Sequence, residues 1–110
     1  MNTFFSAGNK RNYIDFKKQI PLQVQTLFDS LRDFCFSLGD NVIEDVRMHR
    51  VVFCKSITFR WFVDIEPEKD SILLKIQRSR KEPHQIIRLT ADENLVQVKE
   101  ILKDAFNVIH

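Results

Sequence analysis

Basic and aromatic side chains alternate along strands predicted in the middle of the chain. In the segment ITFRWFVDI (57–65), the two-residue period of a strand places Arg60 and Phe62 together on one face, which we expect to point away from the core. Lys75 and Arg88 are expected on the same outer face of two later strands. An open sheet with such residues can bind nucleic acid, because cations contact phosphates and an aromatic ring stacks on bases. The four residues therefore predict a binding face.

A second group of cations occupies the polar segment RSRK (78–81). Arg78, Arg80 and Lys81 could contact phosphates or an acidic protein, although they also suit a solvated hairpin tip. The segment 47–88 holds ten Lys and Arg against five Asp and Glu, a net charge of +5, whereas the rest of the chain carries −3. We therefore predict an accessory binding module with nucleic acid as its partner.

The alternative is a contact between proteins. Phe62, Leu73 and Ile86 are expected on the outer face beside the cations. An exposed apolar group of this kind is also typical of a homodimer or of a site for another protein. The sequence leaves the two kinds of partner open.

Catalytic chemistry finds little support in the sequence. The carboxylates of segment 64–70 surround Pro67 and predict a solvated turn rather than a nuclease metal site. Cys35 and Cys54 are expected in the core, and a pair of Cys54 with His49 has no supporting motif. The spacings CxxC, HxxxH and HExxH are absent from the sequence. We therefore predict no enzyme, no metal and no cofactor.

Length and composition predict one globular domain. The chain has 110 residues, of which 44% are hydrophobic, and its two cysteines do not make a disulfide scaffold, so we expect a cytoplasmic protein. It contains no apolar run of about 18 residues, so no membrane contact is predicted. Residues 1–11, with the pair Phe4-Phe5, are expected as a flexible arm, and residues 12–110 as a single α+β domain.

Two amphipathic helices are expected to position the strands. The first runs from Pro21 to Gly39, where a left-handed glycine would end it. The second would start at a capping box, Thr90 to Glu93, and end near Val108. The apolar stripe of the first helix consists of Val24, Leu27, Phe28, Leu31, Phe34, Cys35 and Leu38.

Short polar turns separate the strands, so an antiparallel meander is predicted. The expected strands are 50–55, 57–65, 71–78 and 84–90, while segment 42–48 is expected as a short helix or an irregular entry. The fold class is therefore α+β, with a two-layer α-β-β-β-β-α order and the helices on one face of a four-stranded sheet. The residues expected to face the helices are Phe59, Trp61, Val63, Ile72, Leu74, Ile76, Ile87 and Leu89.

The order of apolar positions and turns also resembles a known family. The stretch VQTLFDSLRDFCFSLGDNVIEDVRMHRVVFCKSITFRWFVDIEPEKDSILLKI (24–76), followed by RLTADENLVQVKEILKDAF (88–106), is similar to an uncharacterised bacterial domain family. Its members stand alone or follow nuclease or restriction-type domains, and some are labelled predicted transport proteins. The resemblance covers about residues 12–108, but segment 78–85 lacks the longer Trp-Gly loop of many members. It implies the same fold and an association with DNA processing or defence, and it transfers no catalytic residue.

Overall fold

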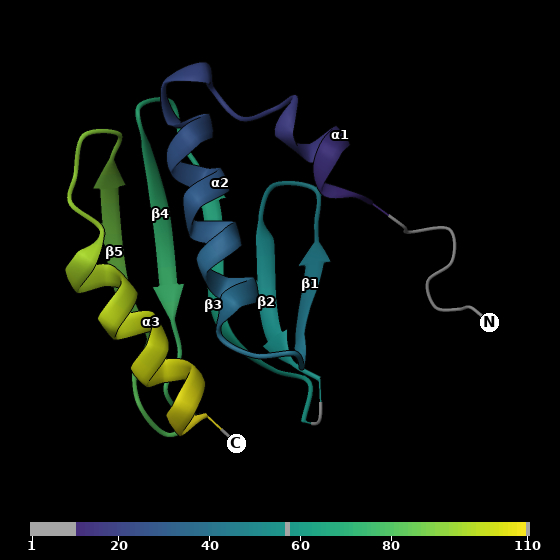
Figure 1. Cartoon of the computed structure of the whole chain (residues 1–110), viewed down its shortest axis with the longest axis vertical. Coiled ribbons are helices and arrows are strands. Elements are labelled where there is room, and N and C mark those ends of the chain that lie inside the picture. Colours follow the sequence, from purple (N-terminus) through teal and green to yellow (C-terminus); the bar gives the residue numbers. More distant parts are fainter. Residues whose placement is uncertain (1–10, 57, 110) are drawn as a thin grey trace.

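A computed structural model describes residues 11–56 and 58–109, and it confirms an α+β fold with an antiparallel sheet (Figure 1). The described part of the chain has five strands and three helices, where four strands and two helices were expected.

The predicted flexible arm, residues 1–11, lies outside the described residues except for Arg11. The elements are α1 (Tyr13–Lys17), α2 (Leu22–Ser37), β1 (Val42–Val46), β2 (Val51–Lys55), β3 (Arg60–Pro67), β4 (Ser71–Ile76), β5 (Gln85–Thr90) and α3 (Val96–Val108).

The strands lie side by side in the order of the sequence, β1-β2-β3-β4-β5, and each pair is antiparallel. Both α2 and α3 lie on the same face of this meander, and Figure 1 shows no helix on the opposite face. We call the opposite face the outer face. No helix in the described part of the chain is long and apolar enough to cross a membrane.

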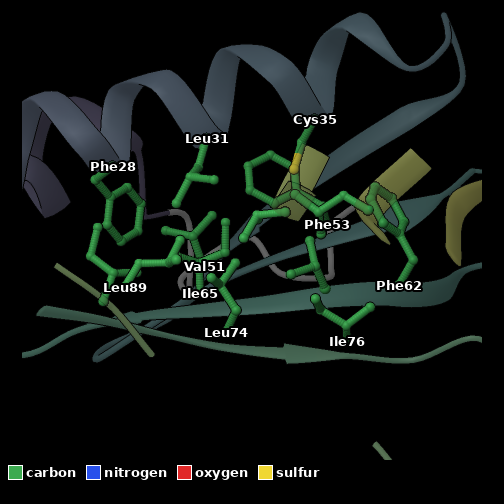
Figure 2. Packing of buried hydrophobic residues seen from close by; sticks show 14 of the residues in the cluster. Phe28, Leu31, Cys35, Val51, Phe53, Phe62, Ile65, Leu74, Ile76 and Leu89 are labelled. Carbon is green, nitrogen blue, oxygen red and sulfur yellow. The ribbon is translucent and has the colours of Figure 1, made fainter. Parts of the chain in front are cut away.

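The core lies between the helices and the sheet. Figure 2 shows Phe28, Leu31 and Cys35 pointing from α2 toward the side chains of the strands. Each large apolar side chain that is fully buried contributes roughly 1.5–3 kcal/mol, so this layer supplies most of the stability. Residues of β2, β3, β4 and α3 with at most 1% exposure complete the core: Val51, Phe53, Phe62, Val63, Ile65, Ile72, Leu74, Ile76, Leu102 and Ala105.

The prediction for residues 42–48 was wrong, because Val42–Val46 form an edge strand paired with β2. Glu44 lies opposite Phe53 and therefore on the helix side of the sheet, where its carboxylate accepts two hydrogen bonds from Arg32. A charged residue at an inward position hides the alternation of a half-buried strand.

Two helix boundaries also differ from expectation. Gly39 is not left-handed, since the described chain has no glycine with positive φ. A Cβ at Gly39 would instead lie 3.1 Å from Phe106 Cζ, so the small residue permits a close approach to α3. Glu93 does accept a hydrogen bond from the Thr90 N–H, at 3.2 Å, but Thr90 still belongs to β5 and α3 starts only at Val96.

Strand β3 contains one residue more than its partner β2. Phe53 lies opposite Val63 and Cys54 lies opposite Trp61, so Phe62 has no partner across this pair. An extra residue of this kind is a β-bulge, and it reverses the inward and outward sense of the residues on one side of it. The bulge decides which side chains reach the outer face.

The helix α1 is joined to α2 through Asp29, whose carboxylate accepts hydrogen bonds from Tyr13 Oη at 2.6 Å and from Lys17 Nζ at 2.7 Å. Burial alone would raise the pKa of Asp29, but the bonds from Lys17 and Tyr13 outweigh it and hold this pKa below its usual value of 3.8. Burial and the bond to Asp29 raise the pKa of Tyr13, so its hydroxyl remains a donor.

We expect acid to weaken this junction. A carboxyl whose pKa is lowered in the folded state stabilises the fold above its unfolded pKa and loses that contribution as the pH falls through the folded value. Thermal unfolding should show Asp29→Asn to be less stable than the native chain near pH 7. The difference should shrink as the pH falls below 3.8, the usual pKa of the group. A difference that does not change with pH would contradict the role given to the ionised carboxylate.

Candidate nucleic-acid interface

The bulge moves half of the predicted outer face to the other side of the sheet. Phe62 was expected outside but is fully buried, with its ring 5.2 Å from that of Phe106 in edge-to-face contact. Arg60 lies opposite Lys55, whose ammonium group is 4.6 Å from the Phe106 ring, so both belong to the helix side. Trp61, expected inside, takes the outer position instead. The reason is the extra residue, because strict alternation fails at a bulge.

Lys75 and Arg88 do lie on the outer face, since they pair with Asp64 and Leu73 in the register of the sheet. Arg88 donates hydrogen bonds to both carboxylate oxygens of Glu68, at 2.8 and 3.3 Å. The bond from Arg88 lowers the pKa of Glu68 and raises the pKa of Arg88. Arg88 is therefore already engaged within the chain.

Most other charges of the outer face are also paired. Arg47 contacts Asp45 at 2.9 Å, and Arg50 contacts Asp64 at 3.2 Å and Glu66 at 3.4 Å. With Lys75 and the Arg88–Glu68 pair included, four cations face four carboxylates, a net charge of zero. Phosphate binding depends on uncompensated cations, so the middle of this face is not where a nucleic-acid backbone would lie.

Uncompensated cations gather instead at one end of the sheet, the lower end in Figure 1, where β3 begins and the β4–β5 loop turns. Arg80 and Lys81 are exposed, and the structure gives them and Arg60 no ion pair within the described residues. Arg78 donates to Asp104 at 2.7 Å and to Glu82 at 3.0 Å, which ties the loop to α3 and raises the pKa of Arg78. We name this region the basic end: Phe59, Arg60, Trp61, Arg78, Arg80, Lys81 and His84.

Both ends of the β4–β5 loop contact Trp61. The Gln77 side-chain amide donates to the Trp61 carbonyl at 2.9 Å, and the His84 ring meets the indole edge to face with 4.9 Å between centroids. These contacts attach both ends of the loop that carries Arg80 and Lys81 to Trp61, whose indole reaches the outer face. Four cations and the two carboxylates bound to Arg78 leave the basic end with a net charge of +2.

A second aromatic ring stands at the basic end. Phe59 is 75% exposed and has a φ of 54°, a left-handed conformation that is rare for a bulky residue. Its N–H donates to the Lys55 carbonyl at 2.7 Å, which closes the turn between β2 and β3. Strained backbone of this kind costs on the order of 1–3 kcal/mol and is common at binding sites. The turn therefore imposes this conformation and leaves the Phe59 ring in solvent, at the residue before Arg60.

The cysteines are poorly suited to nucleophilic catalysis. Cys35 is buried on α2, and burial raises its pKa far above the ordinary range of a thiol. Burial also raises the pKa of Cys54, on which Asp45 and Arg47 act as well. A thiol is a nucleophile only as its thiolate, so both groups are held in the unreactive form. Within residues 11–56 and 58–109, no three His, Cys, Asp or Glu side chains form a group that could hold a metal ion.

The structure therefore brings together only part of the predicted site. Arg60, Arg78, Arg80 and Lys81 share the basic end, whereas Phe62 lies in the core and Lys75 and Arg88 lie farther along the outer face. Phe59 and Trp61 were expected to face the helices, and this expectation was wrong for both, while His84 was given no role at the site. An exposed aromatic pair beside cations could have been suspected from FRW (59–61), but not its placement. Comparisons with protein-family models, curated proteins and solved structures gave no match to this chain.

Proposed function

We propose that this chain is a non-enzymatic binding module that holds single-stranded nucleic acid at the basic end. The observation that carries the proposal is that two accessible rings, Trp61 and Phe59, lie at the same end of the sheet as three cations without an ion pair within the described residues. These cations are Arg60, Arg80 and Lys81. Rings that stack on bases and cations that follow the phosphates are the two parts of a single-strand site.

Single strands suit this surface better than a duplex. An unpaired base exposes its flat face to Trp61 or Phe59, whereas a duplex hides that face within the stack. The basic end also offers a loop and a turn rather than a helix that could enter a major groove. Binding to the sugar-phosphate backbone would depend strongly on salt, since each neutralised phosphate releases counterions.

The experiment compares two double variants with the same net charge. Arg80→Glu/Lys81→Glu reverses two cations of the basic end, and Lys18→Glu/Lys69→Glu reverses two exposed cations at the opposite end. Fluorescence anisotropy with a labelled single strand of about 10 nucleotides would be measured between about 50 and 200 mM salt. We expect the first variant alone to lose affinity and to reduce the slope of log K against log salt by about 1.4.

A further variant removes the exposed ring of Phe59 and leaves the hydrophobic core intact. Phe59→Gly relieves the left-handed strain, so its stability should be maintained while single-strand affinity falls roughly tenfold, the worth of one stacked base. Equal loss in both double variants would indicate a general charge effect. The absence of binding by the native chain at low salt would exclude the function.

A homodimer through the outer face remains the second candidate. The charges of the outer face balance to zero, and Ile86 on this face is 62% exposed. Such a surface suits a self-complementary contact with a second protein better than it suits binding of a polyanion. Light scattering at high protein concentration distinguishes the two, since a strictly monomeric mass would remove the homodimer.

A further inference from the structure

The outer face has a hollow of about 240 Å³ next to the basic end, lined by Arg47, Val52, Trp61, Asp64, Lys75 and His84. Val52 forms part of its floor, because it is only 5% exposed although it points away from the helices and lies outside the main core cluster. Trp61 and His84 belong both to this hollow and to the basic end. A strand held at the basic end would therefore have a base within reach of the hollow.

The floor of the hollow pairs an acceptor with a donor. Asp64 on β3 lies directly opposite Lys75 on β4, so their side chains are neighbours on the outer face. The Asp64 side chain is 14% exposed, and Arg50 Nη1 donates to its Oδ2 at 3.2 Å. Arg50 approaches one oxygen of the carboxylate and fixes its position, which leaves lone pairs available to a ligand.

Two planar groups flank this floor. Val52 and Asp64 lie opposite each other and form one row across β2 and β3. Trp61, which lies opposite Cys54, is on one side of this row. Arg47, the residue after β1, is on the other side. The Arg47 guanidinium is oriented by Asp45, with Nε and Nη2 at 3.0 and 2.9 Å from Oδ2. An indole and a guanidinium both stack on flat aromatic rings. The hollow is thus built for a ring whose edge meets Asp64 and Lys75.

We propose that the hollow takes a guanine base, a proposal that rests on the single-strand function given above. The Watson–Crick edge of guanine has two adjacent donors, N1–H and N2–H₂, that match the carboxylate of Asp64, and one acceptor, O6, that matches the ammonium of Lys75. Adenine reverses this order, because its N6–H₂ would face the ammonium and its N1 the carboxylate. Thymine has a single ring donor between two acceptors.

The chain contains one tryptophan, so its fluorescence reports stacking on Trp61, and selectivity among the bases distinguishes the hollow, where Asp64 and Lys75 would contact the base edge. Guanosine and adenosine 5′-monophosphate carry the same phosphate, and their titrations therefore compare the bases alone. We expect guanosine monophosphate to quench Trp61 at a concentration roughly tenfold lower than adenosine monophosphate, with inosine monophosphate, which lacks N2–H₂, in between. Equal quenching by all three would overturn the proposal.

A matched pair of variants assigns the preference to Asp64. Asp64 and Glu66 lie on the same strand and face and both contact Arg50, but only Asp64 lines the hollow. Asp64→Asn should abolish the preference for guanosine over adenosine monophosphate, and Glu66→Gln should retain it. If both variants abolish it, the preference arises from Arg50 and the assignment to Asp64 is overturned.

The two proposals can fail separately. Single strands that bind without any preference for guanine would overturn the base assignment and leave the single-strand function in place. Selective quenching by guanosine monophosphate in a chain that binds no oligonucleotide would support the hollow as a nucleotide site and exclude the function at the basic end.

Discussion

Replacing Phe62 with alanine is expected to lower the free energy of unfolding by about 3–5 kcal/mol. Phe62 is fully buried against Phe106, between the sheet and α3, so its removal leaves a cavity that the surrounding core cannot fill. An unfolding free energy of about 5–15 kcal/mol is typical of a small domain, so this loss would be a large part of the total. Denaturation in urea, followed by circular dichroism, measures it.

The control is the neighbouring residue. Trp61→Ala removes a larger ring, but one that lies partly exposed on the outer face, so we expect a loss of only about 1 kcal/mol. Strict alternation along β3 predicts the opposite ranking, with Trp61 as the more costly position. A smaller loss for Phe62 than for Trp61 would therefore contradict the bulge itself.

Glu44→Ala is expected to cost about 2–3 kcal/mol, the second largest effect. The Glu44 side chain is only 14% exposed and accepts two hydrogen bonds from Arg32, at 2.5 and 3.1 Å. The same guanidinium lies 4.2 Å from the centroid of the Tyr13 ring, so it connects α1, α2 and β1. Without Glu44 this cation would lie half-buried and lack its ionic partner.

A double-mutant cycle measures the coupling. Glu44→Ala and Arg32→Ala should together cost clearly less than the sum of the single variants, because either one already breaks the pair. Glu66→Ala is the comparison, since Glu66 contacts Arg50 on the outer face and is more exposed, and we expect a loss below about 1 kcal/mol. Additive losses for Glu44 and Arg32 would show that their contact contributes nothing of its own.

The periodicity of the sequence was sufficient for most of the fold. The apolar stripe of α2 and the alternation in β4 identify the two layers, and Ile72, Leu74 and Ile76 are buried as expected. Strand β1 was not recognised because its inward position 44 carries a glutamate. The partner that makes this charge acceptable, Arg32, comes from a helix packed on the sheet, and a local pattern contains no information about such a contact.

The candidate site was less predictable, for one physical reason. A bulge leaves no mark in the types of the residues around it. In the run FRWFV (59–63), aromatic side chains occur at both odd and even positions, so either set could face the core. The sequence therefore supports either assignment of faces equally well. Arg60 and the loop cations come together because the start of β3 and the end of β4 lie at the same end of the sheet. An antiparallel meander with known turns implies this arrangement.

The order of the elements also has a consequence for synthesis on the ribosome. Helix α2 is translated before any strand, yet its apolar stripe is buried only when β2, β3 and β4 have followed. Until residue 76 leaves the exit tunnel, the nascent chain exposes that stripe and is most open to aggregation or to chaperones. Each strand then pairs with the strand translated just before it, so the sheet can form one hairpin at a time and pack against the helix already synthesised.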